Sequence, residues 1–191
     1  MSDLGGQLAS AIELLAPSGY PFAVVGGLAV SARTEPRFTR DVDIAVAVPD
    51  DTSVERLVRE AAARGYSVFS LLEHDVSKRI ATVRMRSGGS ILDLLFASSG
   101  IESETVAEAE RFELLPGVTA PVARVAHLMA LKLLARDDRT RPQDAADLVR
   151  LKAVATEADL TRLRELLTLI EARGYNRNRE LHASLEELLR D

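Results

Sequence analysis

Two acidic side chains spaced two residues apart offer the clearest chemistry in this sequence. Asp41 and Asp43 lie at the start of an apolar run, residues 42–48 (VDIAVAV), which predicts a β-strand. Because side chains alternate along a strand, both carboxylates are expected to leave the same face of the sheet. Burying them there costs free energy unless a cation or many hydrogen bonds compensate their charge. Such oxygen ligands favour Mg²⁺ or Mn²⁺.

A third carboxylate and a glycine pair extend this pattern. Asp93 is the single charge in the apolar run 90–96 (SILDLLF), which predicts a buried strand. Three converging carboxylates can hold two metal ions, one activating an attacking hydroxyl and one neutralising a triphosphate. Gly26 and Gly27 end a short strand and open a helix, so backbone amides can approach an anion closely. The combination predicts a site for a metal-bound triphosphate.

Composition excludes several other classes of protein. The chain has 191 residues, of which 47% are hydrophobic and 28% charged, as in a soluble globular protein. It has no cysteine, which excludes disulfides and thiolate metal sites, and its three histidines lack the close spacing of zinc hydrolases. His127 is therefore interpreted as a helix-packing or partly exposed residue. The net charge of −5 argues against non-specific binding to nucleic acid.

The uncharged stretch 14–32 is interrupted by two prolines and three glycines, so it does not predict a membrane span. The N-terminus lacks a basic region and a small-residue cleavage site, so we expect no secretory signal and a cytoplasmic protein.

Hydrophobic periodicity predicts an α+β chain in two parts. Residues 1–121 should form a mixed β-sheet flanked by helices, and residues 122–191 a helical domain whose helices cover 124–135, 142–153, 157–173 and 176–190. Ser53 is the expected N-cap of a helix that ends near Gly65, and Ser87-Gly88-Gly89-Ser90 predicts a hairpin turn. The front part carries a net charge of −6 and the helical part +1.

The motifs resemble those of a known family. The pattern Gly26-Gly27-x-Ala29, then Arg37-x-Thr39-Arg40-Asp41-x-Asp43-Ile44, then Ile91-x-Asp93, resembles the nucleotidyltransferase fold of the DNA polymerase beta superfamily. More narrowly, the chain resembles the AbiEii/AbiGii toxins of type IV toxin-antitoxin systems.

The narrower resemblance rests on the second half of the chain. The helix VAHLMALKLLARDD contains Lys132, and the motif PQDAADL contains Asp144 and Asp147. In the family, the residue before the first of these aspartates is commonly lysine, whereas this chain has Gln143.

The resemblance implies a role for each site residue. Asp41, Asp43 and Asp93 would bind metal, with Asp93 also acting toward the attacking hydroxyl. Lys132 would pair with the triphosphate, and Asp144 would be an additional essential acid that orients Lys132 or the base. The basic residues that flank the acids, Arg37 and Arg40, are candidates for phosphate contacts.

The implied reaction moves a nucleoside monophosphate from an NTP to an acceptor hydroxyl and releases pyrophosphate. The implied acceptor is the 3′ end of tRNA, and the implied partner a cognate antitoxin. Two alternatives stay open. An enzyme like the aminoglycoside or lincosamide nucleotidyltransferases would share the motifs, and an acidic front suits a cationic drug. A non-catalytic nucleotide-binding or partner-binding protein is the other.

Overall fold

The computed structural model describes residues 4–136 and 142–190. Its centre is a mixed seven-stranded sheet in the order β3-β4-β5-β2-β1-β7-β6, where β2 runs parallel to β5 and antiparallel to β1. The strands are β1 (Phe22–Val25), β2 (Asp41–Val46), β3 (Ser67–Glu73), β4 (Ile80–Ser87), β5 (Ser90–Leu95), β6 (Glu110–Leu115) and β7 (Val118–Val122). The helices are α1 (Leu4–Leu15), the 3₁₀ turn η1 (Ala16–Ser18), α2 (Gly26–Arg33), α3 (Asp51–Ala63), α4 (Glu102–Ala107), α5 (Val125–Ala135), α6 (Pro142–Val154), α7 (Glu157–Ala172) and α8 (Leu181–Arg190). The predicted α+β class and mixed sheet are confirmed.

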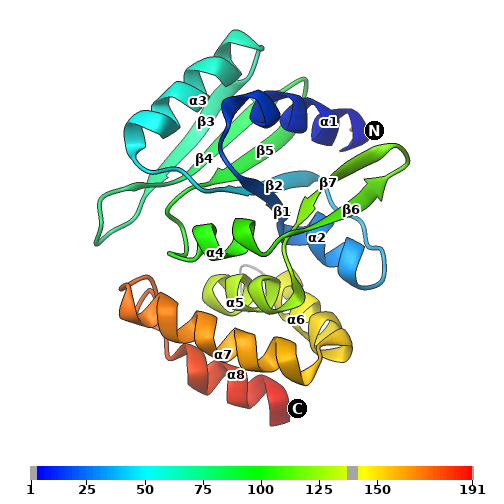
Figure 1. Cartoon of the computed structure of the whole chain (residues 1–191), viewed down its shortest axis with the longest axis vertical. Coiled ribbons are helices and arrows are strands. Elements are labelled where there is room, and N and C mark those ends of the chain that lie inside the picture. The colour runs from blue at the N-terminus through cyan, green and yellow to red at the C-terminus, as the bar shows by residue number, and fades with distance from the viewer. Residues whose placement is uncertain (1–3, 137–141, 191) are drawn as a thin grey trace.

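Helices cover both faces of this sheet (Figure 1). Helices α1 and α3 lie on one face, whereas α2, α4 and the helices α5–α8 lie on the other. Every element after β7 is helical, and no described helix has the length and apolarity that crossing a membrane requires. A single buried apolar cluster runs from α1 through the sheet to α8, so the division into two domains at residue 121 stays a prediction.

Three details differ from the expectations. Helix α3 begins before Ser53, because the Asp50 side chain accepts a hydrogen bond from the Ser53 N–H at 2.8 Å and acts as the N-cap. Strand β7 was not expected, since Pro121 interrupts its apolar pattern. Helix α8 begins at Leu181 rather than at residue 176, because Arg177 and Asn178 adopt left-handed φ angles that no helix continues.

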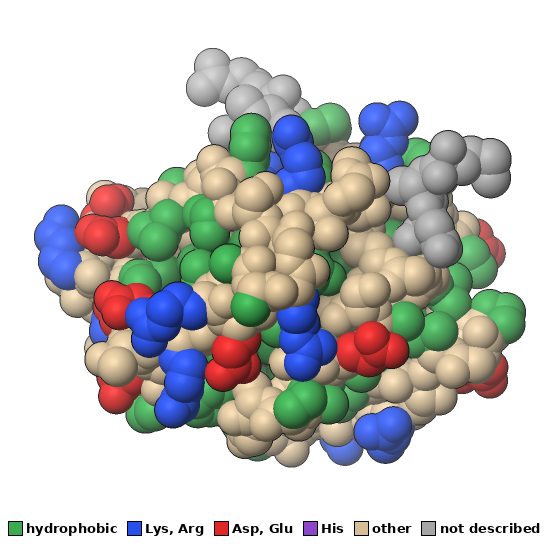
Figure 2. All heavy atoms as spheres, turned by 90° about the horizontal axis from the view of Figure 1, so that it is seen from above, with side chains coloured by type: hydrophobic (Ala, Val, Ile, Leu, Met, Phe, Trp, Pro, Cys, Tyr) green, Lys and Arg blue, Asp and Glu red, His purple; other side chains and the backbone are tan. Residues whose placement is uncertain are grey.

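Charged side chains fix the helical part against the front of the chain. Glu108 pairs with Arg162 of α7 at 2.5 Å, and Glu104 of α4 pairs with Arg173 at 2.7 Å. Figure 2 shows the molecule from above Figure 1, on the side away from helices α5–α8. This face carries both charge signs interspersed with apolar side chains.

His127 is a packing residue, the first of the two interpretations from the sequence. It lies in α5 and is 0% exposed, with Nε2 at 3.8 Å from the Glu108 Oε2 atom. Burial lowers the pKa of His127 to about 4; the Glu108 carboxylate opposes this shift, and the nearby Arg162 and Arg124 guanidinium groups add to it. The imidazole is thus neutral near pH 7.

We expect the free energy of unfolding to fall as the pH falls from about 6.5 toward 4, because only the unfolded state then binds a proton at His127. This shift in the pKa of His127 changes the free energy of unfolding by about 3 kcal/mol at most. The variant His127→Leu should lose this part of the pH dependence in urea unfolding measured at several pH values. His182→Leu is the control, because that side chain is 43% exposed. An unchanged pH slope in His127→Leu would contradict the assignment.

Candidate functional site

The three predicted carboxylates lie on the neighbouring strands β2 and β5. Asp41 and Asp43 lie on the same face of β2 and are half-buried, whereas Val42 between them is buried on the other face. In the parallel pair of β2 with β5, Asp43 is the register partner of Asp93, which is only 5% exposed. The backbone register therefore brings the acids of two distant motifs to one place.

A cation from the next strand already pairs with the third acid. In the β4–β5 hairpin, Arg84 is the register partner of Asp93. Its Nε and Nη2 atoms donate hydrogen bonds to the two oxygens of Asp93, at 2.8 and 2.6 Å. These hydrogen bonds, together with the fields of Asp93, Asp41 and Asp43, raise the pKa of Arg84 above its ordinary value, so the guanidinium is firmly charged.

Sequence reasoning missed Arg84, although the signal for it was present. The hairpin turn pairs Ser87 with Ser90, and counting outward from that pair places Arg84 opposite Asp93.

Among residues 4–136 and 142–190, no three histidine, aspartate or glutamate side chains form a ready metal-binding group.

The glycine pair brings the backbone close to both sides of the site. Gly26 has φ +63°, and a Cβ atom there would lie 2.0 Å from Asp43 Oδ2 and 2.8 Å from Asp43 Cβ. A Cβ atom at Gly27 would lie 2.6 Å from Arg37 Nη2 and 3.0 Å from Thr39 Oγ1. Consecutive Cα atoms are about 3.8 Å apart. The Asp43 carboxylate and the Arg37 guanidinium thus lie against adjacent residues, at the first turn of α2.

A second charged cluster joins α5, α6 and the loop before β2. Arg37 donates to both oxygens of Asp147, each at 2.7 Å, and Asp147 is fully buried. The Lys132 Nζ atom lies 2.5 Å from Asp144 Oδ1 and 2.9 Å from Asp147 Oδ2. Although burial works against ionisation, hydrogen bonds from Arg37 and Lys132 hold the pKa of Asp147 below its ordinary value.

The structure thus brings together most of the residues that the sequence predicted for the site. Lys132 donates a hydrogen bond to Asp144, a contact that fits the first of the two roles implied for Asp144, orienting Lys132 or orienting the base. Asp147, which the sequence placed only in the motif, proves to be the acid that connects Lys132 with Arg37. Arg40 is exposed and lies outside both clusters, with its guanidinium over the ring of Phe38.

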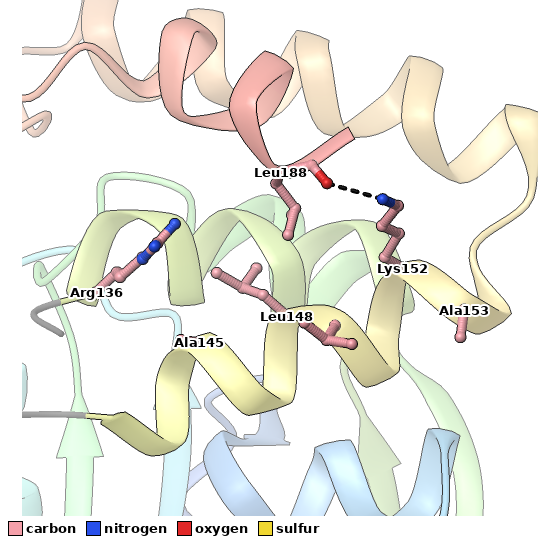
Figure 3. A pocket seen from close by; sticks show the side chains of 7 residues that line it. Arg136, Ala145, Leu148, Lys152, Ala153 and Leu188 are labelled. Atoms are coloured by element: carbon pink, nitrogen blue, oxygen red, sulfur yellow. Dashed lines mark hydrogen bonds between the residues drawn. The ribbon is translucent and has the colours of Figure 1, made fainter. Parts of the chain in front are cut away.

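A pocket lies away from both charged clusters. This pocket of about 400 Å³ lies beside α6 and α8, and none of the site's carboxylates lines it. Figure 3 shows Lys152 reaching from α6 to α8, where its Nζ atom donates to the Leu188 carbonyl oxygen at 2.9 Å. Apolar side chains, including Leu148 and Leu188, line most of the rest.

The fold matches solved structures of nucleotidyltransferases. The solution structure of the antibiotic-resistance factor ANT(2'')-Ia covers 100% of this chain and 99% of its own, with 19% identity and a TM-score of 0.54. An antigenic nucleotidyltransferase-like protein from Paracoccidioides brasiliensis covers 97% and 93%, with 16% identity and a TM-score of 0.54. The lincosamide antibiotic adenylyltransferase LnuA, bound to lincomycin, covers 78% and 97%, with 15% identity and a TM-score of 0.51. No curated protein gives a significant match.

These likenesses establish a nucleotidyltransferase fold. The family described as "Nucleotidyl transferase AbiEii toxin, Type IV TA system" matches residues 11–191, and the chain belongs to this family. It is therefore a nucleotidyltransferase of the type IV toxin-antitoxin class, as the resemblance predicted.

Replacing Gly26 should be more disruptive than its backbone angle alone requires. Gly26→Ala forces a left-handed φ on alanine and drives its Cβ atom into Asp43, whose own Cβ atom is fixed by β2. Gly88→Ala is the matched control, because Gly88 has φ +55° but nothing within 4 Å of its Cβ position. In urea unfolding, Gly88→Ala should cost about 1–2 kcal/mol and Gly26→Ala ~1–3 kcal/mol more. Equal losses would contradict the close approach.

Proposed function

We propose that this chain transfers a nucleoside monophosphate from an NTP to the 3′ end of tRNA and releases pyrophosphate. The observation that carries the proposal is the Gly26-Gly27 pair, whose adjacent residues lie against the Asp43 carboxylate on one side and the Arg37 guanidinium on the other. Nucleotidyl transfer requires both parts, because oxygen ligands hold a divalent cation while fixed positive groups hold the triphosphate.

The carboxylates fit Mg²⁺ or Mn²⁺ in donor chemistry. Asp41 and Asp43 would hold the cation, and Asp93 would complete the site after Arg84 releases one of its oxygens. A bound cation would supply neutralising charge to the phosphoryl group and make the attacking hydroxyl more acidic. Asp93 would then accept the proton of that hydroxyl, because it is buried and is the register partner of Asp43 on the neighbouring strand.

The second cluster would bind the triphosphate. Backbone amides at Gly26 and Gly27 open helix α2, whose N-terminus favours an anion. Lys132 would contact a phosphate from its place between Asp144 and Asp147, and Asp144 would act as its positioning residue. Arg37 and Arg40 would add guanidinium contacts from the loop before β2.

Membership of the AbiEii family supports a growth-arresting role. A tRNA whose 3′ end carries an added nucleotide cannot be aminoacylated, which would stop translation. In this role the protein would act in the cytoplasm, where tRNA and NTPs occur, and a cognate antitoxin would limit its effect.

A small-molecule acceptor is the second candidate. ANT(2'')-Ia has been crystallised with adenylyl-2''-tobramycin, and that structure covers 88% of this chain with a TM-score of 0.55. The net charge of −6 on residues 1–123 also suits a cationic acceptor.

The test is incubation of the purified protein and Mg²⁺ with each α-labelled NTP, together with bacterial tRNA or a panel of aminoglycosides and lincosamides. We expect label in tRNA from the wild-type chain and at least a 10²-fold lower rate from Asp43→Asn, which removes a charge that the metal requires. Asp75→Asn is the control, because Asp75 is exposed in the β3–β4 turn.

Label in a drug would support the second candidate instead. Label in neither acceptor, with a folded protein, would count against both and favour a non-catalytic role. Equal rates for Asp43→Asn and the wild type would contradict the assigned mechanism.

Arg84 should compete with the divalent cation for Asp93. Arg84→Gln removes a positive charge that pairs with both oxygens of Asp93, so Mn²⁺ should bind at least about tenfold more tightly. Electron paramagnetic resonance of free Mn²⁺, without nucleotide, measures this affinity directly. Arg86→Gln is the control, since Arg86 is exposed on the same strand and lies over Phe69. Unchanged Mn²⁺ affinity in Arg84→Gln would mean that Asp93 is not a metal ligand.

A further inference from the structure

An exposed aromatic ring lies beside the candidate site. Phe38 is 78% exposed, the highest value among the large hydrophobic side chains of residues 4–136 and 142–190. It lies in the loop between α2 and β2, three residues before Asp41. The chain contains 5 phenylalanines, 3 tyrosines and no tryptophan, so few aromatic rings are available for contact with a substrate.

The neighbours of Phe38 turn its ring away from the protein. Arg37 and Thr39 both direct their side-chain ends toward Gly27. Phe38, which lies between them, has no such contact and faces solvent with its exposed side chain. The ring is therefore presented outward by a loop whose inner side lies against the site.

The backbone that carries the ring is anchored. Arg37 Nη1 donates to the Phe38 carbonyl oxygen at 3.1 Å, while its other nitrogens bind the buried Asp147. The loop is thus tied to α6 at the residue immediately before Phe38. A ring on such a loop loses little conformational freedom when a ligand packs on it.

A guanidinium group accompanies the ring. The Cζ atom of Arg40 lies 5.4 Å from the centroid of the Phe38 ring. Together the two side chains offer an aromatic ring with a planar cation over it. Bases of nucleotides stack on aromatic rings and on arginine, and the cation also attracts the attached phosphate.

We propose that Phe38 and Arg40 form a stacking site for a nucleobase of the substrate. This proposal rests on the proposed function, since it places the base of either the NTP or the terminal RNA nucleotide beside Asp41. Phe38 would contact the base and Arg40 the base or its phosphate. The two sources share the same chemistry, and binding measurements can distinguish them.

The chain contains a matched control pair. Phe69 on β3 is 60% exposed, and the Arg86 guanidinium lies 4.7 Å from its ring centroid. This pair has the same chemistry, but β3 is an edge strand separated from β2 by β4 and β5. A response confined to Phe38 would therefore reflect its place beside the site.

Phe38→Trp and Phe69→Trp each introduce a single tryptophan into a chain that has none. The probes are each NTP, a short RNA hairpin with the tRNA acceptor end, and inorganic tripolyphosphate, all without Mg²⁺ so that no turnover occurs. We expect the fluorescence of Phe38→Trp to be quenched by an NTP or by the RNA, whichever supplies the base. Tripolyphosphate should not quench it, and Phe69→Trp should not respond to any probe.

Affinity measurements on Phe38→Leu and Phe38→Tyr provide the second readout. Loss of stacking in Phe38→Leu should weaken binding of the quenching ligand about fivefold to 100-fold, while Phe38→Tyr retains it. No quenching by any base-bearing probe, or equal affinity for the Phe38→Leu and wild-type chains, would overturn the proposal. If transfer occurs but Phe38→Leu binds normally, the proposed function stands and the stacking site does not. If bases bind at Phe38 but no acceptor is labelled, the stacking site stands and the proposed function does not.

Discussion

The close approach of the Gly26 backbone to the Asp43 carboxylate is the constraint on which the rest of the site depends. With any side chain at Gly26, strand β1 and helix α2 could not meet β2 at their present distance. Gly27 repeats the arrangement toward Arg37, so the first turn of α2 touches two charged groups at once. At Gly26 the contact reaches the Asp43 Cβ atom, which β2 fixes, whereas at Gly27 it involves the ends of the Arg37 and Thr39 side chains, which can shift.

Charge is distributed unequally between these clusters. Among the described residues, the second cluster joins two acids, Asp144 and Asp147, to three cations, Lys132, Arg37 and Arg150. In the group of Asp41, Asp43 and Asp93, the Arg84 guanidinium pairs with both oxygens of Asp93. A group of three carboxylates suits a divalent cation, whereas a cluster with more cations than acids suits an anion such as a triphosphate.

The sequence predicted the strands that carry the acids, because each is an apolar run with a clear boundary and a charge where no packing role fits. The proximity of Asp43 to Asp93 followed from the resemblance to the family's motifs, because no local pattern indicates which strands pair. The partners of these acids were harder to predict. Asp147 binds Arg37 across 110 residues, and no local pattern encodes so distant a pair. The N-cap of α3 was assigned to Ser53 because serine is a good cap, but Asp50 offers a carboxylate and follows Pro49.

The β4–β5 hairpin has a consequence for how this sequence can diverge. Its turn, Ser87 to Ser90, sets the register in which Arg84 faces Asp93. Loss or gain of a single residue there would move every side chain of one strand to the opposite face of the sheet relative to the other. The guanidinium would then leave the carboxylates, and a buried residue such as Met85 would be brought to the polar side. Selection can accordingly vary the identity of the turn residues far more freely than their number, so the length of this short loop should be a more durable feature of the lineage than its composition.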